Sequence, residues 1–170
     1  MKNIAKYLLV IILLSIVNFT FSQKKEQITA VEDILNKWHK AAATADFEEY
    51  FSYMDEEAIF IGTDPTENWN TKAFKNFSKP YFDKGKAWNF TPFERNIFFS
   101  KNKKIAWFDE LLDTQMKICR GSGVLEKVRG EWKIKHYVLS IAIPNMHANE
   151  VVKIKEIFDN QLLQKLNISK

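Results

Sequence analysis

Three carboxylates interrupt an apolar stretch, AWFDELLD, at residues 106–113. Asp109, Glu110 and Asp113 stand there among bulky side chains that favour burial. A buried carboxylate without a partner is costly, so such a group either becomes neutral or finds a hydrogen-bond donor. The stretch is therefore either a half-exposed strand or the wall of a cavity in which an acid binds a ligand or transfers a proton.

Strand alternation divides these side chains between two faces, but both faces mix apolar residues with acids. One face would carry Trp107, Asp109, Leu111 and Asp113, and the other Phe108, Glu110 and Leu112. The alternation thus does not identify the buried side. Asp109 either enters a pocket or pairs with a basic residue across the sheet. Arg120 is the candidate partner of Asp109 or Glu110, and could instead hold an anionic ligand.

The segment CRGSGVL places Ser122 between Gly121 and Gly123. Glycine inside a strand marks a bend, a bulge or a close approach of the backbone to another group. A bend would open the sheet around an interior ligand, and Ser122 could then contact it. Curvature of the sheet alone is the other interpretation.

His136 is the histidine best placed for proton transfer, because imidazole titrates near neutral pH. Alternation puts it on one face with Ile134, Val138 and Ser140, and we expect this to be the more buried face. A structural histidine in the core is the alternative. The three histidines show no paired ligand spacing, so we predict no metal site, and no cofactor is indicated.

Aromatic residues are abundant, and several could wall a cavity for a ring-shaped or acyl ligand. The candidates are Trp38, Trp69, Phe82, Trp88 and Trp107. Asp64 precedes a proline, which is first a turn signal and only second a sign of a binding loop at a cavity rim.

Apolar spacing predicts helices first and a sheet afterwards. Helices are expected over residues 28–45, 46–54 and 74–85, with Pro80 kinking or breaking the third about one turn before its end. A short strand is expected near residues 58–61. Four strands joined by short connections follow, at residues 87–100, 104–116, 118–128 and 132–143, which predicts an antiparallel meander. An amphipathic helix over residues 148–166 ends the pattern. The fold class is α+β, with the sheet curved around the first helix.

The N-terminus carries the pattern of a secretory signal peptide, which predicts export to the periplasm or the medium. Two lysines precede a short apolar run, and Thr20 and Ser22 stand at −3 and −1 of a cleavage point before Gln23. The predicted organisation is residues 1–22 as signal peptide, 23–146 as one α+β domain and 147–170 as a C-terminal helix. The apolar run is too short to span a bilayer, so we expect no stable membrane insertion after cleavage.

The amino-acid composition of the chain limits the classes of partner that it could bind. The net charge of +4 falls by two when the signal peptide leaves, and the chain contains only three arginines. This argues against a nucleic-acid surface, which would gather basic side chains on one face. Cys119 is the only cysteine, so no intramolecular disulfide can form, and its apolar neighbours indicate a buried thiol.

The order of elements resembles the nuclear transport factor 2-like superfamily, a cone-shaped α+β fold with an interior pocket. Local stretches resemble its SnoaL-like branch. They are WHKAAATADFEEYFSYM, AIFIGTDPTENW, KPYFDKGKAW, AWFDELLD, CRGSGVL and EWKIKHYVLSIAIPN, which together span roughly residues 28–146. The superfamily includes isomerases, dehydratases, cyclases and binding or dimerisation modules, so the resemblance is specific for the fold and weak for activity.

The resemblance implies that Trp107 and Asp109 point into the cone and that Glu110 faces outward or toward a hairpin neighbour. Together with the signal-peptide pattern and an outer sheet face that we expect to be apolar, it favours an exported protein that binds a small, partly apolar molecule and forms a homodimer through that face. One alternative is a cofactor-independent isomerase, dehydratase or cyclase with Asp109 or His136 as general base. Another is a dimerisation module with a filled cone. The predicted ligand-binding residues are Trp38, Asp64, Trp69, Trp88, Glu94, Trp107, Glu110, Arg120 and Ser122.

Overall fold

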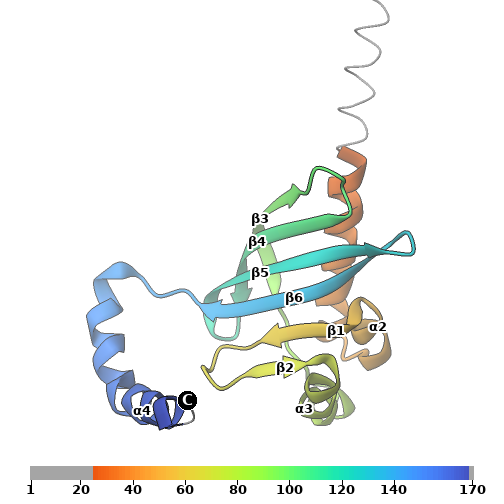
Figure 1. Cartoon of the computed structure of the whole chain (residues 1–170). Coiled ribbons are helices and arrows are strands. Elements are labelled where there is room, and N and C mark those ends of the chain that lie inside the picture. The colour runs from red at the N-terminus through yellow and green to blue at the C-terminus, as the bar shows by residue number, and fades with distance from the viewer. Residues whose placement is uncertain (1–24, 169–170) are drawn as a thin grey trace, which may run out of the picture.

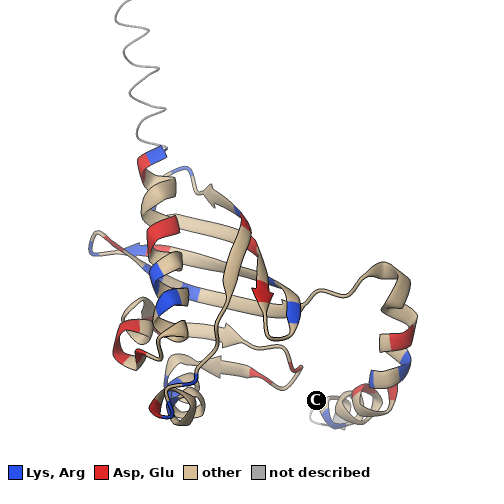
Figure 2. Ribbon diagram, turned by 180° about the vertical axis from the view of Figure 1, so that it is seen from behind, with Lys and Arg blue, Asp and Glu red and all other residues tan. Residues whose placement is uncertain are grey.

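The computed structural model describes residues 25–168, and the predicted signal peptide at residues 1–22 lies outside this range. A curved sheet of six strands forms the centre of the molecule, and an N-terminal helix lies across its inner face (Figures 1 and 2). This arrangement confirms the predicted α+β class.

The N-terminal helix covers residues 25–43, and its apolar stripe faces the sheet. Val31, Leu35, Trp38 and Ala42 are all buried, at spacings of three and four residues that place them on one side of a helix. Asp46 caps the next helix, α2 (Phe47–Ser52), by accepting a hydrogen bond from the Glu49 N–H at 2.9 Å.

The third helix, α3 (Thr71–Asp83), continues through Pro80, so of the two effects expected of this proline, a kink or a break, the break does not occur. Proline removes one backbone donor, but it does not prevent burial of the side chains on either side of it. Ser78 and Phe82 are both buried, and their packing holds the last turn in place.

The strand order in the sheet is β2-β1-β6-β5-β4-β3. Its strands are β1 (Met54–Ile61), β2 (Asn68–Asn70), β3 (Thr91–Phe99), β4 (Ile105–Thr114), β5 (Lys117–Val128) and β6 (Glu131–Ile141). Strands β3 to β6 form the predicted antiparallel meander. The sequence did not predict β2, nor that β1 pairs in parallel with β6.

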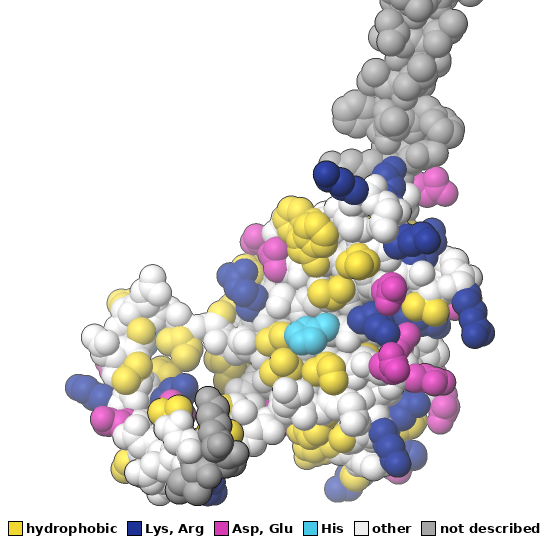
Figure 3. Space-filling view, in the orientation of Figure 1, with side chains coloured by type: hydrophobic (Ala, Val, Ile, Leu, Met, Phe, Trp, Pro, Cys, Tyr) yellow, Lys and Arg dark blue, Asp and Glu magenta, His cyan; other side chains and the backbone are white. Residues whose placement is uncertain are grey.

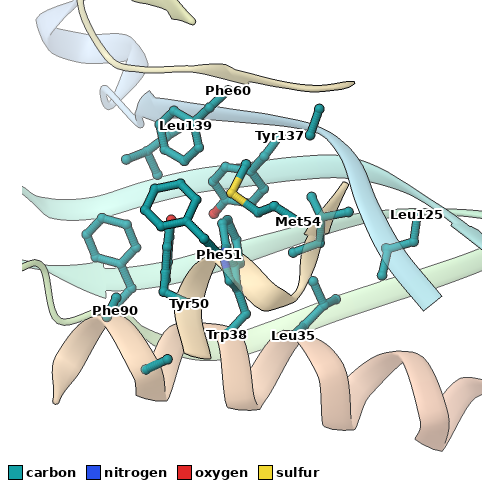
Figure 4. Close-up of a cluster of buried hydrophobic side chains, with 14 of the residues drawn as sticks. Leu35, Trp38, Tyr50, Phe51, Met54, Phe60, Phe90, Leu125, Tyr137 and Leu139 are labelled. Atoms are coloured by element: carbon teal, nitrogen blue, oxygen red, sulfur yellow. The ribbon is translucent and has the colours of Figure 1, made fainter. Parts of the chain in front are cut away.

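Aromatic side chains fill most of the space between the sheet and the helices (Figure 4). Trp38 lies at the centre, stacked on Tyr50 with ring centroids 5.1 Å apart and edge-on to Tyr137 at 4.8 Å. Phe60 and Phe74 stack at 4.0 Å beside them. These contacts bury large apolar surfaces and form the core that supports the site described below.

The last helix, α4 (Ala148–Ile168), lies apart from the sheet beyond Pro144 and the short turn η1 (Asn145–His147) (Figure 1). Its contacts with other elements are chiefly with η1. Ile154, Ile157 and Phe158 are exposed on it. Among the described residues, no helix combines the length and the apolar character needed to cross a membrane.

Candidate functional site

The structure reverses the expected orientation of β4. Its buried side chains are Ala106, Phe108, Glu110, Leu112 and Thr114. Glu110 therefore faces the interior and is 1% exposed, whereas Asp109 and Trp107 lie on the outer face. The expectation that Asp109 enters the cone is wrong. Its Oδ1 instead accepts a hydrogen bond from the Asn96 amide at 3.1 Å.

Glu110 is the centre of a buried polar network. Its Oε1 lies 2.8 Å from His39 Nε2 and accepts a hydrogen bond from the Tyr137 hydroxyl at 3.1 Å. Its Oε2 accepts from Arg95 Nε at 2.8 Å, and Arg95 Nη2 lies 2.6 Å from the same oxygen. Arg95 Nη1 donates to Asn36 Oδ1 at 2.8 Å. Both carboxylate oxygens thus have partners, which offsets the cost of burial.

The network holds Glu110 in its charged form. Burial alone would raise the pKa of Glu110, but the hydrogen bond and charge of His39, together with Arg95, lower it below the usual 4.5. Burial, reinforced by the nearby charge of Glu110, raises the pKa of Tyr137 well above its ordinary value. Tyr137 therefore stays a neutral donor to the carboxylate.

The glycines of CRGSGVL explain why β4 takes this orientation. Gly121 lies opposite Glu110 and Gly123 opposite Phe108, on the inner face of β5. A Cβ atom at Gly121 would stand 2.3 Å from the Tyr137 hydroxyl and 2.9 Å from Glu110 Oε1. The absence of these two side chains makes room for the acid and for Phe108. The backbone of β5 thus approaches Glu110, Tyr137 and Phe108 closely at these glycines, a role distinct from the two weighed from the sequence, a bend around a ligand and curvature alone.

The other expected polar residues near this site lie on the outer face. Arg120 is exposed, opposite Leu111 and Ser140, and belongs to none of the ion pairs found among residues 25–168. The partner of Glu110 is Arg95. Ser122 lies half-buried opposite Asp109, and Glu94 is exposed on β3.

His136 also faces outward, contrary to expectation. Leu125 pairs with Ile134 and Val124 with His136, so Lys135 is an extra residue in β6. This bulge shifts the alternation: Ile134 and Tyr137 are both buried, and His136 moves to the outer face. The histidine of the interior is His39.

A small cavity opens between the β1–β2 loop, α3, the segment before β3 and the β4–β5 turn. We call it the aromatic pocket, and its volume is about 190 Å³. It is lined by Phe60, Gly62, Thr63, Glu67, Trp69, Phe74, Phe77, Trp88, Phe90, Gln115, Met116 and Leu139. The predicted wall residues Trp69 and Trp88 are among them, whereas Trp38 lies in the core and Trp107 on the outer face.

The pocket and the Glu110 network are neighbours within the cone. Phe90, which lines the pocket, packs edge-on against His39 with ring centroids 6.0 Å apart. Asp64 belongs to the loop at the rim, but its carboxylate accepts hydrogen bonds from the Thr66 N–H and hydroxyl. These bonds lower the pKa of Asp64, which keeps the turn residue ionised.

The family model for the SnoaL-like domain matches residues 31–144. The chain belongs to this family. Solved structures agree, and the fold of the SnoaL-like domain is that of the nuclear transport factor 2-like superfamily.

One similar structure is an NTF2-like protein of unknown function from Pseudomonas putida KT2440. It has a TM-score of 0.58 and 10% identity, covering 69% of this chain and 87% of the other. A proposed scytalone dehydratase from Novosphingobium aromaticivorans DSM 12444 has a TM-score of 0.61 and 12% sequence identity, and the match covers 72% of this chain and 89% of the other. A proposed ketosteroid isomerase from Shewanella frigidimarina NCIMB 400 has a TM-score of 0.55 and 18% sequence identity, and the match covers 65% of this chain and 94% of the other. None of the curated proteins matches the chain.

Other features of this SnoaL-like domain are less suited to a ligand. A hollow of about 730 Å³ is an open groove between the start of β1, α3 and the β5–β6 hairpin. Some of its charges are paired, Lys133 with Glu131 at 3.2 Å and the adjacent Lys135 with Asp55 at 2.9 Å. Within the described part of the chain, no three His, Cys, Asp or Glu side chains gather in a way that would hold a metal ion.

Sequence reasoning missed the residues that build the site around the predicted ones. These are Asn36, His39, Phe60, Glu67, Phe74, Phe77, Phe90, Arg95, Gln115, Met116, Tyr137 and Leu139. His39 follows Trp38 on the buried side of the first helix, and that position was the available signal for an interior histidine.

Proposed function

We propose that this SnoaL-like domain binds a small, partly apolar molecule in the aromatic pocket. The supporting observation is the pocket itself, a cavity of about 190 Å³ whose wall is mostly aromatic and aliphatic with a few polar groups at one side. Such a composition is typical of small-molecule sites. The volume favours a ligand smaller than a drug-sized molecule, because aromatic side chains already fill the rest of the cone.

The experiment is a screen of small apolar fragments by ligand-observed NMR against the wild type and a cavity-filling variant. Leu139→Phe adds a ring inside the pocket, and Val138→Phe makes a comparable addition on the opposite face of β6. We expect fragments to bind the wild type and Val138→Phe but not Leu139→Phe. Equal binding to all three proteins, or to none, would contradict the proposal.

The placement of acid–base groups gives no support to the enzymatic alternative with Asp109 or His136 as base. Both lie on the outer face of the sheet, and neither lines the aromatic pocket. A general base must come within hydrogen-bond reach of the proton that it removes, directly or through one water. We therefore propose binding as the function.

We also propose that a second copy of the chain covers the outer face of the sheet, where hydrophobic side chains gather (Figure 3). Phe98 and Trp107 stack there with centroids 6.0 Å apart, and they are 47% and 45% exposed. Exposed apolar surface of this kind is best buried against a partner, and a homodimer is the simplest symmetric solution.

Light scattering should give about twice the mass of one mature chain. Trp107→Lys places a charge in the proposed interface and should shift the protein to monomer. Tyr81→Lys introduces the same charge at an exposed aromatic residue of α3, and it should leave the dimer intact. A wild type that is monomeric at tens of micromolar would reject this assembly.

A further inference from the structure

The aromatic pocket has a distinctive charge pattern. Its wall contains the six aromatic residues Phe60, Trp69, Phe74, Phe77, Trp88 and Phe90. Glu67 is the only charged residue among those that line it, and no lysine, arginine or histidine takes part. Aromatic rings have electron-rich faces, so a wall of rings beside a carboxylate favours a ligand that carries positive charge.

The fold holds the Glu67 carboxylate in place from the backbone side. The Asp64 N–H donates to Glu67 Oε2 at 3.1 Å, and the Gly62 N–H donates to the Glu67 carbonyl at 3.0 Å. A Cβ atom at Gly62 would stand 2.1 Å from Glu67 Oε2, so the carboxylate lies in the space that a side chain at Gly62 would need. The geometry of the loop thus places a negative charge at the pocket.

No basic side chain of the described residues neutralises this charge. Glu67 belongs to none of the ion pairs within residues 25–168, and the neighbouring Asp64 is ionised as well. Lys75 and Lys79 of α3 do lie over aromatic rings, but over Phe51 and Phe47, which do not line the pocket. The pocket therefore offers acceptors and rings to a ligand that brings its own positive charge.

We propose that the ligand of the aromatic pocket is a small organic cation of the alkylammonium class, an inference that rests on the binding function proposed above. Aromatic rings attract such a cation when it lies over their faces, and this attraction is strongest for a desolvated, methylated ammonium group. The Glu67 carboxylate adds a direct charge interaction. The cavity volume limits the ligand to a compact head group with a few carbon atoms.

The experiment compares two probes that have the same shape and differ in charge. Choline carries a quaternary nitrogen where 3,3-dimethylbutan-1-ol carries a quaternary carbon. Titration calorimetry or NMR should show that choline binds about ten-fold more tightly than the neutral alcohol. Raising the salt concentration should weaken choline binding and leave the alcohol unaffected, because salt screens only the charge interaction.

Two substitutions assign the effect to the pocket. Glu67→Gln keeps an oxygen that can accept from the Asp64 N–H, so the loop should stay folded while choline affinity falls about five-fold. Affinity for the neutral alcohol should stay unchanged. Glu48→Gln, at an exposed residue of α2, removes the same charge far from the pocket and should alter neither affinity. Melting temperatures of both variants show whether the fold is kept.

The outcomes separate this inference from the function on which it rests. If the alcohol binds as tightly as choline and Leu139→Phe abolishes both, the pocket binds ligands but the preference for a cation is wrong. Tighter binding of the anionic analogue 3,3-dimethylbutanoate overturns the inference in the same way. If neither probe nor any apolar fragment binds, both proposals fail.

Discussion

Gly121 of β5 lies directly opposite Glu110 of β4, and a side chain at Gly121 would collide with the Glu110 carboxylate. The two residues are therefore structurally coupled. The glycine provides the space, and the acid fills it with a carboxylate that contacts Arg95 and His39 and accepts a hydrogen bond from the neutral Tyr137 hydroxyl. An acid at this depth is tolerated because the chain supplies all its hydrogen-bond partners.

Gly121→Ala should destabilise the domain. The added methyl group would stand 2.3 Å from the Tyr137 hydroxyl and 2.9 Å from Glu110 Oε1, so one of these groups has to move. Overpacking of this kind costs about 1–3 kcal/mol, measurable by urea denaturation. Ser122→Ala on the outer face should change stability by less than about 0.5 kcal/mol. Equal stability of the two variants would show that the network tolerates the extra methyl group.

Glu110→Gln should lower the free energy of unfolding strongly. It removes the charge that balances Arg95, whose side chain is only 8% exposed. Breaking a buried ion pair on one side costs about 3–5 kcal/mol, because the remaining charge stays unpaired in the interior. Thermal melts of Glu110→Gln, Arg95→Met and the double variant measure the coupling. We expect the double variant to lose less stability than the sum of the losses in the two single variants.

Asp109→Asn is the matched control for this cycle, because it changes the adjacent residue on the opposite face of the same strand. Asp109 is half-buried with a single hydrogen bond to Asn96, so its substitution should have little effect on the melting temperature. A larger loss for Asp109→Asn than for Glu110→Gln would contradict the assignment of Glu110 as the buried acid.

The stability of the protein should fall in acid, and Glu110 should account for part of the fall. Its pKa is lower in the folded protein than its usual 4.5. Its stabilising contribution is therefore complete above about pH 4.5 and is lost as the pH falls through the folded value. Urea midpoints measured from pH 7 to pH 3 should decline more gently for Glu110→Gln than for the wild type.

The urea midpoint of Glu110→Gln should still decline to some extent as the pH falls. Burial alone would raise the pKa of Asp55, but the Glu57 N–H and Lys135 lower it, so Asp55 contributes in the same direction. Parallel wild-type and Glu110→Gln curves across the acid range would mean that Glu110 titrates alike in the folded and unfolded chains.

The signal-peptide interpretation predicts that the mature protein begins at Gln23. Signal peptidases require small residues at −3 and −1, which here are Thr20 and Ser22. N-terminal sequencing of protein from the periplasm or the medium checks the cleavage point. Ser22→Lys should block cleavage, while Gln23→Ser, just beyond it, should not. A recovered protein that still carries Met1 would refute the signal-peptide interpretation.

The sequence predicted the helices and the meander well, because both leave a local signal. The spacing of Val31, Leu35 and Trp38 defines a helix face, and short connections between the last four strands allow only antiparallel pairing. Of the five aromatic residues proposed as cavity walls, Trp69 and Trp88 line the aromatic pocket, whereas Trp38, Phe82 and Trp107 do not.

The site is built by contacts between residues far apart in the sequence, and the spacing of residues along the chain does not predict such contacts. The orientation of β4 follows from the contact of Glu110 with Gly121, and the orientation of His136 from one extra residue, Lys135, in β6. Arg95 and His39 meet Glu110 only because the sheet curves around the first helix. Alternation predicts which residues share a face, but it cannot say which face is buried when both carry acids.

The parallel pairing of β1 with β6 has a consequence for the time course of folding. Residues 54–61 find their main partner strand only when residues 131–141 are available, so this part of the sheet consists of non-local contacts. Closing such a long loop costs conformational entropy before the stabilising contacts between the strands can form, and this slows folding. We therefore expect residues 54–83, which include Trp69 and Phe74, to complete their packing only when β6 docks. Before that step a newly made chain should be most prone to aggregation, and this is the period in which a chaperone would protect it.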